Sequence, residues 1–130
     1  MTYIARCCCK ACEIEVDGEP TLNAVCNCAS CKRRTGSAFG WSAYFRNEDI
    51  KRRQGAFSTY RVPGPPPTNR SFCTACGTTM IWESEGADQT GFAAGCFEAT
   101  PLPEPAITAY DDRRCPWVGL PDSWMRYSPG

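Results

Sequence analysis

The sequence predicts a single, mainly β domain of short antiparallel strands, and three observations support this. The chain has 130 residues, about the length of one ordinary domain. Short segments rich in β-branched and aromatic residues alternate with turn residues along most of it. No stretch keeps a 3.6-residue apolar period long enough for a substantial helix. We therefore expect one domain over residues 1–130, without internal repeats.

The expected elements follow from alternation and turn residues. In segment 12–16 apolar and acidic residues alternate up to the turn signal Asp17-Gly18, which predicts a strand. Further strands are expected at 22–25, 38–46, 57–62, 70–73, 78–83 and 91–97. One or two helical turns are expected near 29–34. The proline-rich segment 63–67 is interpreted as an internal loop, because the cysteine sets on either side of it need each other.

Composition and charge exclude several classes of function. Lys plus Arg and Asp plus Glu both number 14, and this zero net charge disfavours a nucleic-acid binder, including a nucleic-acid zinc ribbon. The basic run Lys51-Arg52-Arg53 is interpreted as a solvated strand end. No apolar run approaches the roughly 18 residues of a membrane helix, and the first residues lack a secretory signal. We therefore expect a soluble, cytoplasmic protein that acts without membrane or nucleic acid.

The chain has 11 cysteines and no histidine. Without histidine, serine-triad and papain-type mechanisms are excluded, because they need an imidazole base. A disulfide scaffold is opposed by the odd count, by the run Cys7-Cys8-Cys9 and by the metal-ligand spacing of most other cysteines. Such spacing in a reducing compartment predicts zinc, with disulfides or inert buried thiols as the alternatives.

The first cysteine set predicts a structural zinc site. Cys73-Thr74-Ala75-Cys76-Gly77 has the spacing of a zinc knuckle, in which a tight turn directs two sulfurs at one ion. A tetrahedral site needs two more thiolates, and Cys7 and Cys9 are the best candidates. We expect them on a strand, where alternate residues face the same side, so that Cys8 points the other way, into packing. The alternative is that Cys73 and Cys76 are core thiols.

The second cysteine set predicts a catalytic zinc site. Cys26, Cys28 and Cys31 supply three thiolates, and three protein ligands with one open position are typical of catalytic zinc. Three thiolates around Zn²⁺ carry a net charge of −1, which the basic run Lys32-Arg33-Arg34 could offset. The alternative is a second structural site closed by another residue, for which Cys96 is one candidate. Cys96 is otherwise interpreted as a small apolar residue, as are Cys12 and Cys115.

With these motifs in place, the sequence resembles the glutathione-dependent formaldehyde-activating enzyme family, which is related to the centromere protein V group. Three cysteine clusters with the family's internal spacing, and two later features, span nearly the whole chain. These are Cys7-Cys8-Cys9, the segment 26–39, Phe72-Cys73-Thr74-Ala75-Cys76-Gly77, Gly95 and Arg114-Cys115-Pro116-Trp117. The chain departs from the family pattern at Lys10, where glycine is usual, at Asn27, where histidine is frequent, and in lacking a histidine before the final Pro-Trp.

The resemblance implies a β-tent fold, with two curved antiparallel sheets clamped by zinc, and a carbon–sulfur lyase activity. That activity is the reversible addition of glutathione to formaldehyde, which gives S-(hydroxymethyl)glutathione. The resemblance also implies two zinc ions per chain. The structural ion is held by Cys7, Cys9, Cys73 and Cys76, and the catalytic ion by Cys26, Cys28 and Cys31.

The expected partners are a small thiol and a small aldehyde, with Lys32, Arg33 and Arg34 as candidate contacts for an anionic thiol. Zinc could ionise the thiol or polarise the aldehyde oxygen. The alternative function is a non-catalytic zinc module or chaperone that binds a protein partner, because one fold supports many functions. The three-cysteine set favours the enzyme, since a binding module needs no open metal position.

Overall fold

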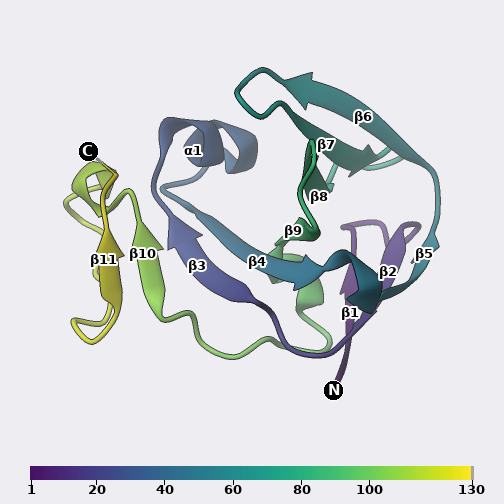
Figure 1. Cartoon of the computed structure of the whole chain (residues 1–130), viewed down its shortest axis with the longest axis horizontal. Coiled ribbons are helices and arrows are strands. Elements are labelled where there is room, and N and C mark those ends of the chain that lie inside the picture. The colour runs from purple at the N-terminus through teal and green to yellow at the C-terminus, as the bar shows by residue number, and fades with distance from the viewer. Residues whose placement is uncertain (130) are drawn as a thin grey trace. The chain divides into compact units, whose positions relative to one another are not determined.

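The computed structural model describes residues 1–129 and shows a mainly β protein (Figure 1). Two compact units are formed by discontinuous segments. The first unit comprises Met1–Leu22 and Ala43–Leu102, and the second comprises Asn23–Ser42 and the described residues from Pro103 onward. Strand β4 (Gly40–Arg46) runs from the second unit into the first. The single domain over residues 1–130 remains a prediction.

The first unit contains two groups of antiparallel strands. One is a three-stranded sheet in the order β1-β2-β5, and the other contains β6, β7, β8 and β9, hydrogen-bonded in chain order. The bounds of these strands are β1 (Thr2–Arg6), β2 (Glu13–Asp17), β5 (Ile50–Gln54), β6 (Phe57–Val62), β7 (Thr68–Cys73), β8 (Thr79–Ser84) and β9 (Gln89–Ala93). Two 3-10 helices, Asn47–Asp49 and Ala94–Phe97, connect them to the rest of the chain. The prediction of short antiparallel strands in two sheets is therefore confirmed.

The second unit is smaller and contains strands, one helix and a 3-10 turn. Its strands lie side by side in the order β11-β10-β3 (Figure 1), and β10 is parallel to both neighbours. Their bounds are β3 (Leu22–Cys26), β10 (Ile107–Ala109) and β11 (Met125–Tyr127), with α1 (Ala29–Thr35) after β3 and a 3-10 turn at Asp111–Arg113. The helix was expected at nearly these residues. No described helix is long and apolar enough to cross a membrane.

An aromatic cluster forms the core of the first unit. Phe45 is fully buried, and its ring lies 5.5 Å from that of Phe92, 5.7 Å from that of Phe97 and 6.1 Å from that of Tyr3. Alternation explains the contribution of β2, where Ile14 and Val16 are buried between half-buried acidic residues. These rings pack edge-on or tilted, the arrangements that aromatic quadrupoles favour.

The strand predictions were wrong or incomplete in several places. The strand expected at 91–97 ends at Ala93, because Ala94 and Gly95 are poor strand formers and begin a 3-10 helix. β5 was missed as a strand because its Lys51-Arg52-Arg53 run is charged. The run, interpreted as a solvated strand end, is exposed but makes up the middle of β5. β5 pairs with β2, and Arg52 forms a salt bridge with Glu13. β10 and β11 were missed because three residues give too little alternation for a prediction. β1 was also missed, although Tyr3 and Ala5 are buried in alternation with more exposed neighbours.

The aromatic cluster generates a stability prediction. Phe45→Ala should lower the free energy of unfolding by about 3–5 kcal/mol, because it removes a buried ring that contacts three others. Denaturant unfolding followed by tryptophan fluorescence would measure this. The matched control is Tyr60→Ala on β6, whose side chain is 39% exposed and which should cost about 1 kcal/mol or less. Equal losses in both variants would contradict the placement of the core.

Candidate metal centres

Four cysteine thiols meet in the first unit, and we call them the four-thiol group: Cys7, Cys9, Cys73 and Cys76. One ligand atom from each lies within 4.8 Å of every other. The Sγ atom of Cys9 is 3.6 Å from that of Cys7 and 3.7 Å from that of Cys73. A disulfide needs about 2.05 Å, whereas four sulfurs placed tetrahedrally about 2.3 Å from zinc are about 3.8 Å apart. The spacing therefore fits a tetrahedral thiolate site and does not fit disulfides.

The two halves of the four-thiol group come from two turns. Cys73 ends β7, and the Gly77 N–H donates to the Cys73 carbonyl at 2.8 Å, which closes the knuckle. Gly77 has φ of +78°, a conformation that favours glycine. The turn thus forms as its sequence predicts.

The expectation that Cys7 and Cys9 lie on a strand was wrong. β1 ends at Arg6, and Cys7 begins a turn in which the Lys10 N–H donates to the Cys7 carbonyl at 3.0 Å. The turn still brings Cys7 and Cys9 to one side. Cys8 is exposed and lies outside the group, so the expectation that it points into packing was also wrong. Lys10 has φ of +66°, so the position where the family usually has glycine is occupied here by a residue in the left-handed conformation.

Backbone amides point at the sulfurs of the four-thiol group. The Cys12 N–H donates to Cys7 Sγ at 3.2 Å, and the Ala75 N–H donates to Cys73 Sγ at 3.3 Å. Thr78, which sequence reasoning missed, lies with its hydroxyl 3.1 Å from Cys76 Sγ and accepts from the Cys8 N–H. Donors directed at sulfur stabilise the thiolate form, which is the form that binds metal. The signal for Thr78 was its place directly after the knuckle glycine.

The pKa values within the four-thiol group are shifted in opposite directions. The Thr78 hydroxyl and nearby backbone N–H groups lower the pKa of Cys76 to about 5, and the backbone N–H of Cys76 lowers the pKa of Cys73. The backbone N–H of Ala11 favours the Cys9 thiolate, but hydrogen bonds with neighbouring thiols outweigh it and raise the pKa of Cys9 to about 12. Neighbouring thiols do not all ionise together, because adjacent thiolates repel each other, so the pKa of one is raised while that of another is lowered. A divalent cation would relieve that repulsion, so the donor set fits one.

Cys12 lies beside this group and has the environment of a neutral core thiol. It is fully buried, and its Sγ donates to the Ala56 carbonyl at 3.4 Å. Burial, followed by contact with Cys73, raises the pKa of Cys12 to about 12. This agrees with the interpretation of Cys12 as a small apolar residue.

Three cysteines meet in the second unit, and we call them the three-thiol group: Cys26, Cys28 and Cys31. Their ligand atoms all lie within 4.8 Å of one another, and all three residues are half-buried. Within the second unit, no further described Cys, Asp or Glu joins this group. Cys96 belongs to the first unit, and its role as a fourth ligand stays an untested alternative. A hydrogen bond with Cys31 and then burial raise the pKa of Cys26, which again makes three thiolates unfavourable without a cation.

Local structure explains how the three thiols converge. β3 ends at Cys26, and Cys28 is the N-cap of α1, where its sulfur accepts a hydrogen bond from the Cys31 N–H at 3.3 Å. Between them, Asn27 is fully buried and donates through Nδ2 to the Thr108 hydroxyl at 2.8 Å and the Ala109 carbonyl at 3.0 Å. Asn27 therefore anchors the cysteine loop to β10, a role its place in the sequence did not reveal.

The basic run lies on α1, and its three members have different surroundings. Lys32 donates through Nζ to the Arg113 carbonyl at 2.6 Å. Arg33 is exposed. Arg34 is half-buried and lies against Gly40, the first residue of β4. Gly40 also borders Cys31. Of the three basic residues, Arg34 is therefore the one whose guanidinium lies next to a cysteine of the three-thiol group.

With the geometry established, comparisons with known proteins identify the family. The family model for the glutathione-dependent formaldehyde-activating enzyme matches residues 2–113. The chain belongs to this family. A crystal structure of a Rhodobacter sphaeroides protein has a similar fold, with a TM-score of 0.59 and 24% identity over 77% of this chain and 90% of that chain. A comparison with curated proteins gave no significant match.

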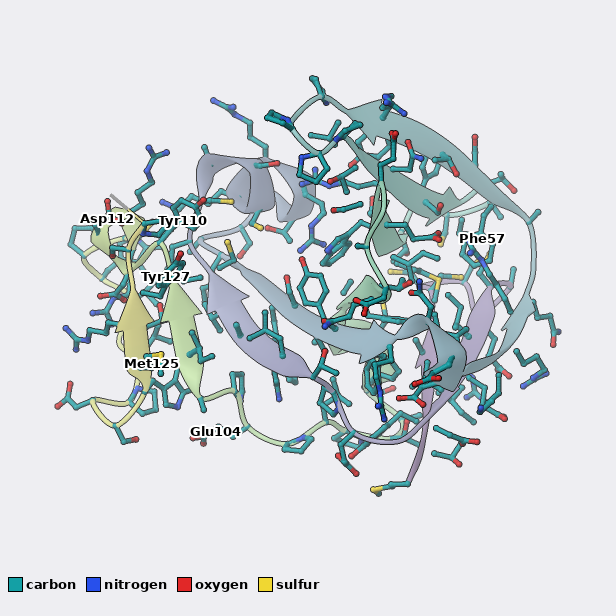
Figure 2. The ribbon with its side chains drawn as sticks, viewed as in Figure 1. Phe57, Glu104, Tyr110, Asp112, Met125 and Tyr127 are labelled. Carbon is teal, nitrogen blue, oxygen red and sulfur yellow. The ribbon has the colours of Figure 1, made fainter. Side chains whose placement is uncertain are left out.

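The family match confirms the resemblance, and it places both thiol groups inside the matched residues. The segment after residue 113, with β11 and its exposed Met125 and Tyr127 (Figure 2), lies beyond them. Zinc as the metal, two ions per chain and the separate roles of the two groups remain predictions.

The left-handed conformation of Lys10 generates the first prediction from these centres. Lys10→Gly should raise the free energy of unfolding by about 1 kcal/mol, because glycine adopts positive φ without the steric cost of a side chain. Denaturant unfolding at fixed zinc concentration would measure it. The control is Lys51→Gly on β5, which should destabilise by roughly the same amount, since its backbone is extended. A loss of stability in Lys10→Gly would contradict the assigned turn.

The two groups should respond differently to loss of one thiol. Cys76→Ser should unfold the first unit, because a structural metal contributes its binding free energy to folding. Cys28→Ser should release one metal ion per chain and leave most of the fold intact. Far-ultraviolet circular dichroism and metal analysis of both variants would show this, with Cys8→Ser as the control that loses neither. If Cys28→Ser also unfolds the protein, the second group is structural.

Proposed function

We propose that this protein is a carbon–sulfur lyase that reversibly adds a glutathione-like thiol to a small aldehyde such as formaldehyde. The observation that carries the proposal is the three-thiol group, which lacks a fourth ligand among the described residues. The family match supports the chemical class. In the addition, sulfur bonds to the carbonyl carbon, the carbonyl π bond breaks, and the thiol proton passes through solvent to the carbonyl oxygen.

The metal we propose is zinc, at two ions per chain. A bound zinc ion with an open position lowers the pKa of a thiol that enters it, so that the thiol is held as the reactive thiolate near neutral pH. Cys26, Cys28 and Cys31 would hold that ion, and Cys7, Cys9, Cys73 and Cys76 would hold the structural one. Thiolate ligands select soft or borderline cations such as zinc over magnesium or calcium.

The protein supplies positioning around this centre. Asn27 fixes the loop that carries Cys26 and Cys28, and α1 fixes Cys31 through the hydrogen bond from its N–H to Cys28 Sγ. No histidine exists anywhere in the chain, so an imidazole base takes no part. We propose that the basic run on α1 favours an anionic thiol such as glutathione, and that the protein works in a reducing compartment such as the cytoplasm.

The test is an exchange measurement, because glutathione and formaldehyde also combine without an enzyme. Magnetisation-exchange NMR with ¹³C-formaldehyde would measure the rate of interconversion between the hydrate and S-(hydroxymethyl)glutathione at equilibrium. The zinc-loaded protein should raise this rate, Cys28→Ser should return it to the uncatalysed rate, and Cys8→Ser should behave as the wild type.

A second outcome of the exchange measurement would favour the alternative function, a non-catalytic zinc module. If the wild-type protein retains both metal ions but accelerates exchange for none of several thiols and aldehydes, catalysis is wrong. The protein would then be a zinc module that binds a protein partner.

A further inference from the structure

Gly40 and Arg34 form a seat beside the three-thiol group. A Cβ atom placed on Gly40 would lie 2.6 Å from Arg34 Nη2 and 3.2 Å from Cys31 Cβ. The guanidinium and the cysteine therefore both border the space where a side chain at position 40 would be. Because Nη2 is buried and lies within 2.6 Å of where that Cβ would be, glycine at position 40 leaves the room that the guanidinium occupies beside β4.

Helix geometry explains why Arg34 occupies this seat and its neighbours do not. Arg34 follows Cys31 by three positions, which places both on one face of α1. Arg33 is rotated away from that face and is exposed. Lys32 is held at the Arg113 carbonyl. Of the three basic residues, only Arg34 has a charge fixed next to a metal-ligand candidate.

Charge balance indicates what a cation at this position does. Zinc with three thiolates carries a net charge of −1, and an entering thiolate would bring it to −2. Arginine stays protonated at all working pH values. With its positive charge included, the net charge of the centre is 0 before the thiolate enters and −1 afterwards. Arg34 and Cys31 are both half-buried, a setting in which charges interact more strongly than in water.

We infer that Arg34, seated against Gly40, is a specificity-determining residue that makes the open position of the three-thiol centre select anionic ligands such as thiolates over neutral ligands. This inference rests on the proposed function for the metal and extends it to the ligand class. The selectivity arises from charge neutralisation at the centre. It does not require contact between Arg34 and the remote carboxylates of glutathione.

The test uses the full chain loaded with Co²⁺ under anaerobic conditions, because thiolate binding to cobalt gives a charge-transfer absorption band. Three probes are titrated: 2-mercaptoethanol, a neutral molecule that binds as thiolate; glutathione; and imidazole, a neutral ligand. Arg34→Gln should weaken binding of both thiols by roughly 10- to 100-fold and change imidazole binding by less than about twofold. The control Arg61→Gln, which replaces an exposed arginine on β6 outside the basic run, should change none of the three.

A second variant tests the seat without removing the charge. Gly40→Ala should displace the guanidinium, because its Cβ would overlap Arg34 Nη2, and should weaken thiol binding in the same direction as Arg34→Gln. Combining both substitutions should add little to Arg34→Gln alone. If the effects of the two substitutions on thiol binding are fully additive, Gly40 acts independently of Arg34. That result would overturn the proposed role of Gly40 in positioning Arg34.

The remaining outcomes of the thiol and imidazole titrations also test the inference. Equal losses for thiols and imidazole would make Arg34 merely structural, and a loss confined to glutathione would show a carboxylate contact; both overturn the inference. Unchanged thiol binding in Arg34→Gln overturns it as well. If Arg34 controls thiolate binding while the wild-type protein fails to accelerate aldehyde exchange, the inference stands and the proposed function fails.

Discussion

The first unit depends on one constraint, which is the convergence of four thiols from two distant turns. Cys9 and Cys73 are separated by 64 positions, and their sulfurs lie 3.7 Å apart. Closing a loop of that length has an entropic cost, which the core contacts of the unit and backbone donors such as the Ala75 N–H help to offset. A metal ion that binds four thiolates would do so, because its binding free energy contributes to folding. The same cation would stabilise both thiolates, although the pKa of Cys76 is lowered and that of Cys9 is raised by their neighbours.

The two thiol groups are suited to different tasks for a physical reason. Four thiolates complete a tetrahedron and leave nothing for a substrate, whereas three leave a position open. The second group is carried by a loop and one short helix that are held by side-chain hydrogen bonds such as Asn27 to Thr108. Its surroundings also contain a fixed positive charge, Arg34. The proposed function thus assigns a structural role to the first group and a reactive role to the second.

The sequence predicted both thiol groups, because their spacing alone limits where the sulfurs can lie. C-x-x-C-G specifies a tight turn through Gly77, and three cysteines within six residues must stay close in any compact loop. It failed at Cys7-Cys8-Cys9, where a turn and a strand both place alternate residues on one side. The backbone alone distinguishes them, through the positive φ of Lys10.

Other features were beyond sequence reasoning because they depend on tertiary pairing. The charged strand β5 exists because its arginines meet acidic residues of β2, and the parallel pairing of β10 with β3 joins segments about 80 residues apart. Local patterns carry no information about such partners.

Zinc X-ray absorption spectroscopy combined with metal analysis would show whether the two thiol groups bind zinc. Protein purified without added metal or chelator should contain two zinc ions per chain, with three to four sulfur ligands at about 2.3 Å on average. Addition of glutathione should raise the average sulfur number toward four. Protein that contains no zinc, with its cysteines recovered as disulfides or unbound thiols, would contradict the proposal of two zinc sites.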